Sequence, residues 1–156
     1  SPSVPFSTEA DTDSTGLALQ ALAAAGVDWH ASSVVGSMAY LRNRTQNDDG
    51  GWGYSETYST TAVNSVGLAL QALAAYQEVP RGLGWTVTTA DAPMTLNNPM
   101  DFALRTQLLT GAFPYQAGGT DDASATYQVM LGIAGRPFPL VRQHFLYLPS
   151  IMRDVQ

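Results

Sequence analysis

The chain contains no cysteine and no lysine, and only 13% of its residues are charged. The lack of cysteine excludes disulfides, thiolate zinc sites and cysteine nucleophiles. All 7 basic residues are arginines, against 13 acidic residues, and the net charge of −6 disfavours a nucleic-acid partner, which needs clustered basic side chains. No apolar run approaches the roughly 20 residues that span a bilayer, so we expect no transmembrane segment. What is present is 156 residues rich in small and aliphatic side chains, which suits one domain of closely packed helices.

A nine-residue peptide occurs twice in the chain. Residues Gly16–Ala24 return unchanged at Gly67–Ala75, 51 positions later, which indicates a duplicated helical unit. Leucine and alanine fill most of the peptide, so both helices should be apolar nearly all round, with Leu19 and Leu70 in the interior. Apolar spacing and capping residues predict five helices, at about 14–25, 32–45, 62–76, 98–109 and 123–134.

A glycine-rich turn follows the second predicted helix, and a weaker copy follows the fourth. Each copy combines a glutamine, small residues and a large aromatic residue: Gln46, Gly50, Gly51 and Trp52, and 61 positions later Gln107, Gly111 and Phe113. Apolar helices thus alternate with amphipathic ones, and glycine turns join them. This order is typical of stacked helical hairpins.

We therefore predict an all-α fold with three parts. They are an extended lead-in at 1–10, a helical repeat domain at 11–135, and an extended C-terminal arm at 136–156, where prolines alternate with β-forming side chains. The chain begins without methionine and without a signal-like apolar stretch, which indicates a processed or trimmed piece of a longer protein.

The turn sequence from Gln46 to Gly53, preceded by a helix that carries Tyr40-Leu41, resembles the prenyltransferase/squalene oxidase repeat of terpenoid cyclases and protein prenyltransferase β-subunits. That family builds an α/α toroid, a double ring of helical hairpins. The likeness covers about 11–135 and implies a partial ring of stacked hairpins, about five helices, that a longer parent or another chain completes. It also implies that Gln46 and Trp52 tie adjoining hairpins together, with Gln107 and Phe113 in a weaker version.

The C-terminal segment around Tyr147-Leu148-Pro149 looks like short C-terminal segments of secreted proteins from filamentous bacteria of the Chloroflexi type. This likeness implies a secreted protein, in an extracellular or cell-surface location.

The acidic segment Asp11-Thr12-Asp13-Ser14-Thr15 looks like the Asp-x-Asp-Asp-Thr acid motif of squalene–hopene-type cyclases, with Ser14 in place of the second residue of the aspartate pair. The likeness implies Asp13, beside Asp11, as an acid that protonates an alkene. Such an acid must be held protonated in a dry cavity, next to hydrogen-bond partners and aromatic rings. The same carboxylates would equally cap the following helix, and we favour that interpretation.

Two further carboxylates, Asp48 and Asp49, precede the first glycine turn. With Asp11 or Asp13 they could bind a hard cation such as calcium. Their spacing matches no EF-hand loop, and solvation of the turn is the simpler interpretation. We expect no resident metal or cofactor.

Three hypotheses for function follow from these features. We favour a non-catalytic extracellular helical-repeat domain that acts in protein assembly or binding, as an oligomer or with other chains or the remainder of a longer parent. The alternatives are a terpenoid-cyclase-like enzyme that uses Asp13 as its acid, and a toroid that binds a small molecule such as cobalamin.

Overall fold

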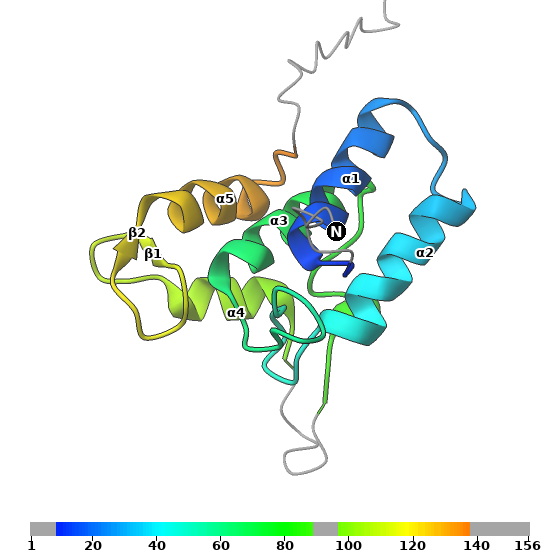
Figure 1. Ribbon diagram of the computed structural model, residues 1–156. Coiled ribbons are helices and arrows are strands. Elements are labelled where there is room, and N and C mark those ends of the chain that lie inside the picture. The colour runs from blue at the N-terminus through cyan, green and yellow to red at the C-terminus, as the bar shows by residue number, and fades with distance from the viewer. Residues whose placement is uncertain (1–8, 89–96, 138–156) are drawn as a thin grey trace, which may run out of the picture.

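The computed structural model describes residues 9–88 and 97–137 (Figure 1). The elements follow the chain in this order: α1 (Thr12–Ala24), α2 (Ser32–Tyr40), η1 (Leu41–Thr45), α3 (Val63–Ala75), η2 (Leu83–Trp85), α4 (Pro99–Thr106), β1 (Phe113–Pro114), β2 (Asp121–Asp122) and α5 (Ala123–Ile133). All five predicted helices are present, and their bounds differ from the predicted ones by up to five residues.

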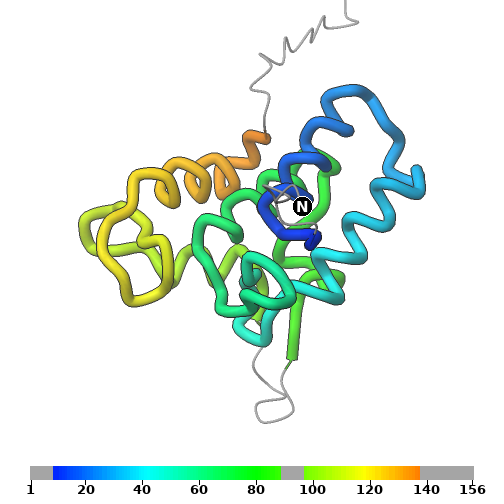
Figure 2. Tube along the Cα trace, viewed as in Figure 1, coloured from blue at the N-terminus to red at the C-terminus, as the bar shows by residue number. Residues whose placement is uncertain are grey.

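Helix α3 is the centre of the molecule. It packs against α1 on one side and against α5 on the other, and α4 also contacts it (Figures 1 and 2). Helices α1 and α3 run in the same direction, as the hydrogen bonds between their corresponding ends show. Asn64 Nδ2 donates to Asp13 Oδ2 at 3.2 Å near the N-termini, and the Tyr76 hydroxyl donates to Val27 O at 3.4 Å beyond the C-termini.

Glycines let the three helices approach closely. A Cβ atom on Gly67 would lie 2.6 Å from the backbone nitrogen of Val129 in α5. A Cβ atom on Gly16 would lie 3.1 Å from the carbonyl oxygen of Leu68 in α3. The α3–α5 contact is therefore closed to any side chain at position 67, whereas the α1–α3 contact leaves slightly more room.

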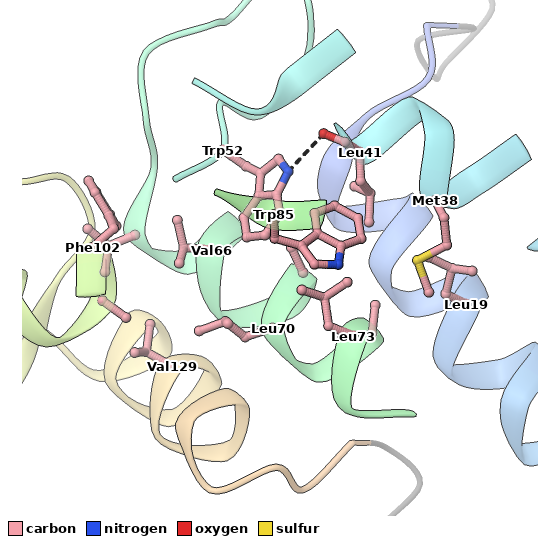
Figure 3. Packing of buried hydrophobic residues seen from close by; sticks show 14 of the residues in the cluster. Leu19, Met38, Leu41, Trp52, Val66, Leu70, Leu73, Trp85, Phe102 and Val129 are labelled. Carbon is pink, nitrogen blue, oxygen red and sulfur yellow. Dashed lines mark hydrogen bonds between the residues drawn. The ribbon is translucent and has the colours of Figure 1, made fainter. Parts of the chain in front are cut away.

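The hydrophobic core surrounds α3 (Figure 3). Leu19 and Leu70 are both fully buried, which confirms the prediction that they are interior. Trp52 and Trp85 pack edge to face in this core, with ring centroids 5.9 Å apart. Trp85 comes from the connection between α3 and α4, so this connection contributes a side chain to the core.

The prediction of an all-α, toroid-type fold is wrong, because the structure contains a small antiparallel sheet. Strands β1 and β2 pair with Phe113 opposite Asp122 and Pro114 opposite Asp121. Single bridges add to this pairing, among them Gln46 with Trp52 and Ala62 with Gln116. In the described residues the fold is therefore mixed, with five α-helices and a small sheet that the second glycine turn forms with the residues before α5. The predicted lead-in and arm lie outside the described residues, apart from residues 9–10 and 136–137.

The second predicted helix is not α-helical to its end. It stops at Tyr40 and continues as the π-helical turn η1. The carbonyl of Leu41 accepts from the backbone N–H of Gln46, five residues on, and also from the indole N–H of Trp52 at 2.9 Å. The carbonyl of Leu41 thus closes the π-helical turn and also satisfies the indole of a buried tryptophan.

Candidate functional site

The first glycine turn is held by hydrogen bonds within the turn and by hydrogen bonds to two other segments of the chain. Trp52 is fully buried, and its indole binds Leu41 O at the end of the preceding helix (Figure 3). The side-chain nitrogen of Gln46 donates to Gly50 O at 3.4 Å and to Trp85 O at 2.9 Å. Gly50 has φ +88°, a left-handed conformation that favours glycine. Gln46 therefore joins its own turn to a segment 39 residues further along the chain.

Gly51 of the same turn lies in close contact with side chains at and near the start of α3. A Cβ atom there would lie 2.5 Å from the Thr61 methyl group. The small residue at this position lets the turn lie directly against the start of the next repeat.

The second glycine turn repeats this arrangement with fewer links. Gln107 Nε2 donates to Gly111 O at 2.9 Å, and Gly111 has φ +86°. Phe113 is fully buried, but its side chain carries no hydrogen-bond donor. Its backbone N–H donates to the Thr126 hydroxyl oxygen at 2.8 Å. Gln107 is exposed, and its side chain closes only its own turn.

Both turns also contact the helix that begins the repeat before them. The carbonyl of Tyr54 accepts from Thr12 N at 2.7 Å, and the carbonyl of Tyr115 accepts from Val63 N at 2.8 Å. Thr12 and Val63 are the first residues of α1 and α3. Each turn therefore satisfies one of the free N–H groups at a helix start. Sequence reasoning missed these links, and no side-chain pattern signals them, because both are bonds between backbone atoms.

The acidic segment divides into two roles. Asp11 is the N-cap of α1, and its Oδ1 accepts from Ser14 N at 2.7 Å. Asp13 lies half-buried against α3, where its Oδ2 accepts from Asn64 Nδ2. Burial raises the pKa of Asp13, Ser65 and Asn64 oppose that rise, and the charge of Asp11 adds to it.

Three buried oxygens around Asp13 have no hydrogen-bond donor. They are Asp13 Oδ1, Asn64 Oδ1 and Ser65 Oγ, for which the described residues provide no partner of good hydrogen-bond geometry. A protonated Asp13 would supply one donor in this place, which agrees with the raised pKa of its carboxyl. The structure therefore places a carboxyl group with a raised pKa at the α1–α3 contact.

Asp48 and Asp49 act in the turn. The carboxylate of Asp49 accepts from Gly51 N at 2.9 Å, and the carbonyl of Asp48 accepts from Asn97 Nδ2 at 2.7 Å. Across residues 9–88 and 97–137, no group of three or more His, Cys, Asp or Glu side chains could hold a metal ion. The joint cation site with Asp11 or Asp13 is not formed in this part of the chain.

An open groove with a volume of about 370 Å³ lies between the two turns. Its lining is neutral and mostly aromatic or hydroxylic: Tyr54, Thr57, Tyr58, Ser59, Thr60, Ala62, Tyr115 and Gln116. The rings of Tyr54 and Tyr58 lie 6.5 Å apart at their centroids. The nearby charge of Asp11 is the largest cause that raises the pKa of the Tyr54 hydroxyl.

The two outer helices of the row α1–α3–α5 each expose an uncharged side. On α1 this side consists of Leu17, Ala18 and Ala21, which we name the α1 end face; Leu17 is 48% exposed. On α5 it consists of Ser124, Tyr127 and Met130, which we name the α5 end face; Tyr127 is 52% and Met130 51% exposed.

A hollow of about 630 Å³ adjoins the α5 end face. Tyr127, Met130, Ala123 and Thr126 are among the residues that line it. The row of packed helices therefore ends in an exposed side on each outer helix, and Asp121 and Asp122 also line the hollow beside α5.

None of the helices in the described part of the chain is long and apolar enough to cross a membrane. No protein-family model matches the sequence, and no curated protein matches it. The resemblance to the prenyltransferase/squalene oxidase repeat therefore stays a prediction from the residues of the glycine turn.

Proposed function

We propose that this chain is a non-catalytic helical-repeat domain that acts in protein assembly, and that its end helices stack on further helices. One observation carries the proposal. The twin peptides have the same sequence, but Leu68 in α3 is 4% exposed and Leu17 in α1 is 48% exposed. A surface that is buried inside one repeat is open at the end of the row.

The composition of the end faces supports close helix contact. Ala18 and Ala21 flank Leu17, and in α3 the corresponding alanines, Ala69 and Ala72, are fully buried. Small residues let helix axes approach, and no charged side chain belongs to the α1 end face. A partner helix could therefore pack there without removing an ion from water.

The expected affinity is modest. Covering one large apolar side chain contributes about 1.5–3 kcal/mol, whereas association costs about 4–15 kcal/mol in lost freedom of motion. Leu17, Tyr127 and Met130 together therefore support weak binding that depends on protein concentration.

Sedimentation of the full chain over a range of concentrations, up to about 1 mM, tests the proposal. We expect the average mass to rise with concentration, and Leu17→Asp and Met130→Asp to shift it toward the single chain. Leu83→Asp is the matched control, because Leu83 is 92% exposed but belongs to neither end helix. Circular dichroism shows whether each variant is folded. A chain that stays monomeric throughout overturns the proposal.

A second candidate function is acid catalysis by Asp13, as in terpenoid cyclases. The observation that favours it is the raised pKa of a half-buried carboxyl beside oxygens that have no donor. Incubation with a polyprenyl substrate would compare the natural chain with Asp13→Asn. Loss of product in the variant supports the acid role, and equal product from both chains removes it.

A further inference from the structure

We propose that the partner at each end is a second copy of this chain, joined head to tail, with α1 of one copy packed on α5 of the next. This inference rests on the proposed function and names its partner. It follows from the order in which corresponding positions of α1, α3 and α5 are covered.

The side of each helix that receives the preceding helix is exposed only on α1. Leu17, Leu68 and Ala125 occupy corresponding positions, 51 and 57 residues apart. Leu68 is 4% exposed against α1, and Ala125 is fully buried in α5. Leu17 is 48% exposed, because none of the described helices covers this side of α1.

The side that faces the following helix is exposed only on α5. Leu19, Leu70 and Tyr127 correspond in the same way. Leu19 and Leu70 are fully buried, and Tyr127 is 52% exposed at the end of the row. Within residues 9–88 and 97–137, no helix therefore precedes α1 in the row and none follows α5.

The α1 end face fits the role of successor because its nine residues are those of α3. In α3 this sequence already receives a helix: Gly16 of α1 packs against Leu68. Position 124 of α5 corresponds to Gly16 and carries a serine. A Cβ atom at position 16 would meet Leu68 O at 3.1 Å, so a side chain as small as serine needs a shift of only a few tenths of an ångström.

The pairing joins two different surfaces, so it is heterologous. A second copy that binds in this way leaves its own α5 end face open to a third. The geometry therefore points to a chain of copies that closes into a ring or continues as a filament, and not to a two-fold dimer.

Disulfide trapping tests this pairing, and the absence of cysteine in the natural chain makes the test clean. A Cβ atom on Gly16 would lie 3.5 Å from Leu68 Cβ, a separation that suits a disulfide. Between copies the corresponding pair is Ser124 and Leu17. We expect an equimolar mixture of Leu17→Cys and Ser124→Cys chains to form a disulfide-linked dimer under mild oxidation. The rate of dimer formation should be at least about tenfold higher than in a mixture of Leu83→Cys and Ser124→Cys chains, because binding raises the effective thiol concentration.

The outcomes separate the two proposals. Fast cross-linking of the mixture, with little cross-linking of either variant alone, supports head-to-tail pairing. Association of the natural chain without this cross-link keeps the assembly function and overturns the pairing, as does fast cross-linking of Leu17→Cys alone. A natural chain that does not associate overturns both.

Discussion

Helices α1 and α3 share nine identical residues but have different surroundings. In α3 the residues Gly67 to Leu73 are all buried, because α1 lies on one side and α5 on the other. In α1 only Gly16, Leu19 and Gln20 of the shared nine are buried. The local sequence therefore determines that both segments are helices, whereas the position in the row determines how much each contributes to stability. Four pairs of substitutions test this comparison.

The largest difference is expected for the paired substitutions Leu68→Ala and Leu17→Ala. Leu68 is 4% exposed, and its truncation should lower the free energy of unfolding by about 2–5 kcal/mol through lost burial and a cavity. Leu17 is 48% exposed, and its truncation should cost less than about 1 kcal/mol in the single chain. Urea denaturation at low protein concentration measures both. Equal losses would show that α1 is covered as completely as α3.

The second largest difference in stability is expected between alanine substitutions at the first glycine of each twin peptide. In Gly67→Ala the new methyl group would lie 2.6 Å from Val129 N, so we expect a loss of about 1–3 kcal/mol from overpacking. In Gly16→Ala the nearest atom is Leu68 O at 3.1 Å, and the higher helix propensity of alanine offsets the crowding. The same denaturation curves compare the two variants. A neutral Gly67→Ala would contradict the close α3–α5 contact.

The glycine turns provide a third comparison, because Trp52 and Phe113 occupy corresponding positions. Trp52→Phe removes the indole donor to Leu41 O and should cost about 1 kcal/mol, besides the lost ring volume. Trp85→Phe is the matched control, since its indole binds the Glu78 carboxylate at a part-buried place. Thermal unfolding should show the larger drop for Trp52→Phe.

The smallest effect is expected at the start of the two helices, where Asp13 stands in the position of Asn64. Because burial raises the pKa of Asp13 in the folded state, its ionised form is disfavoured there. Asp13→Asn should therefore raise stability at neutral pH, and this gain should disappear as the pH falls below the ordinary aspartate pKa of about 3.9.

Asp101 supplies a control of opposite sign for this pH dependence. Hydrogen bonds from Asn98 and Arg81 lower the pKa of Asp101, so its contribution is present above the ordinary pKa and is lost in acid. Asp101→Asn should thus lower stability at neutral pH and have little effect in acid. Unfolding curves between about pH 3 and 7 test both signs. A stabilising effect of Asp13→Asn that persists in acid would point to packing as its cause.

The sequence was sufficient to predict where the helices lie and which residues cap α1 and α5. Apolar spacing located all five helices, and Asp11 and Asp122 cap α1 and α5 through hydrogen bonds of 2.7 Å. The all-α prediction was wrong because β1 contains only Phe113 and Pro114, and a two-residue strand with proline has no alternating pattern to detect.

The missed parts of the candidate site depend on tertiary contact. Trp85 lies in a stretch with Pro80, Gly82 and Gly84, whose composition is that of a loop, and only the packing against Trp52 makes it a core residue. The links from the carbonyls of Tyr54 and Tyr115 involve backbone atoms, which every residue type carries. The two end faces could not be separated by sequence, because the exposed Leu17 and the buried Leu68 belong to identical peptides.

The twin peptides also create an ambiguity while the chain folds. During collapse, either copy could occupy the central place, since their nine residues cannot be told apart. The residues that precede them resolve the choice: Val63 and Val66 are fully buried before the second copy, whereas Thr12 and Thr15 stand in their places before the first. If the first copy took the central place, the Thr15 hydroxyl would enter an apolar site. These few side chains therefore favour one order of the helices over the other.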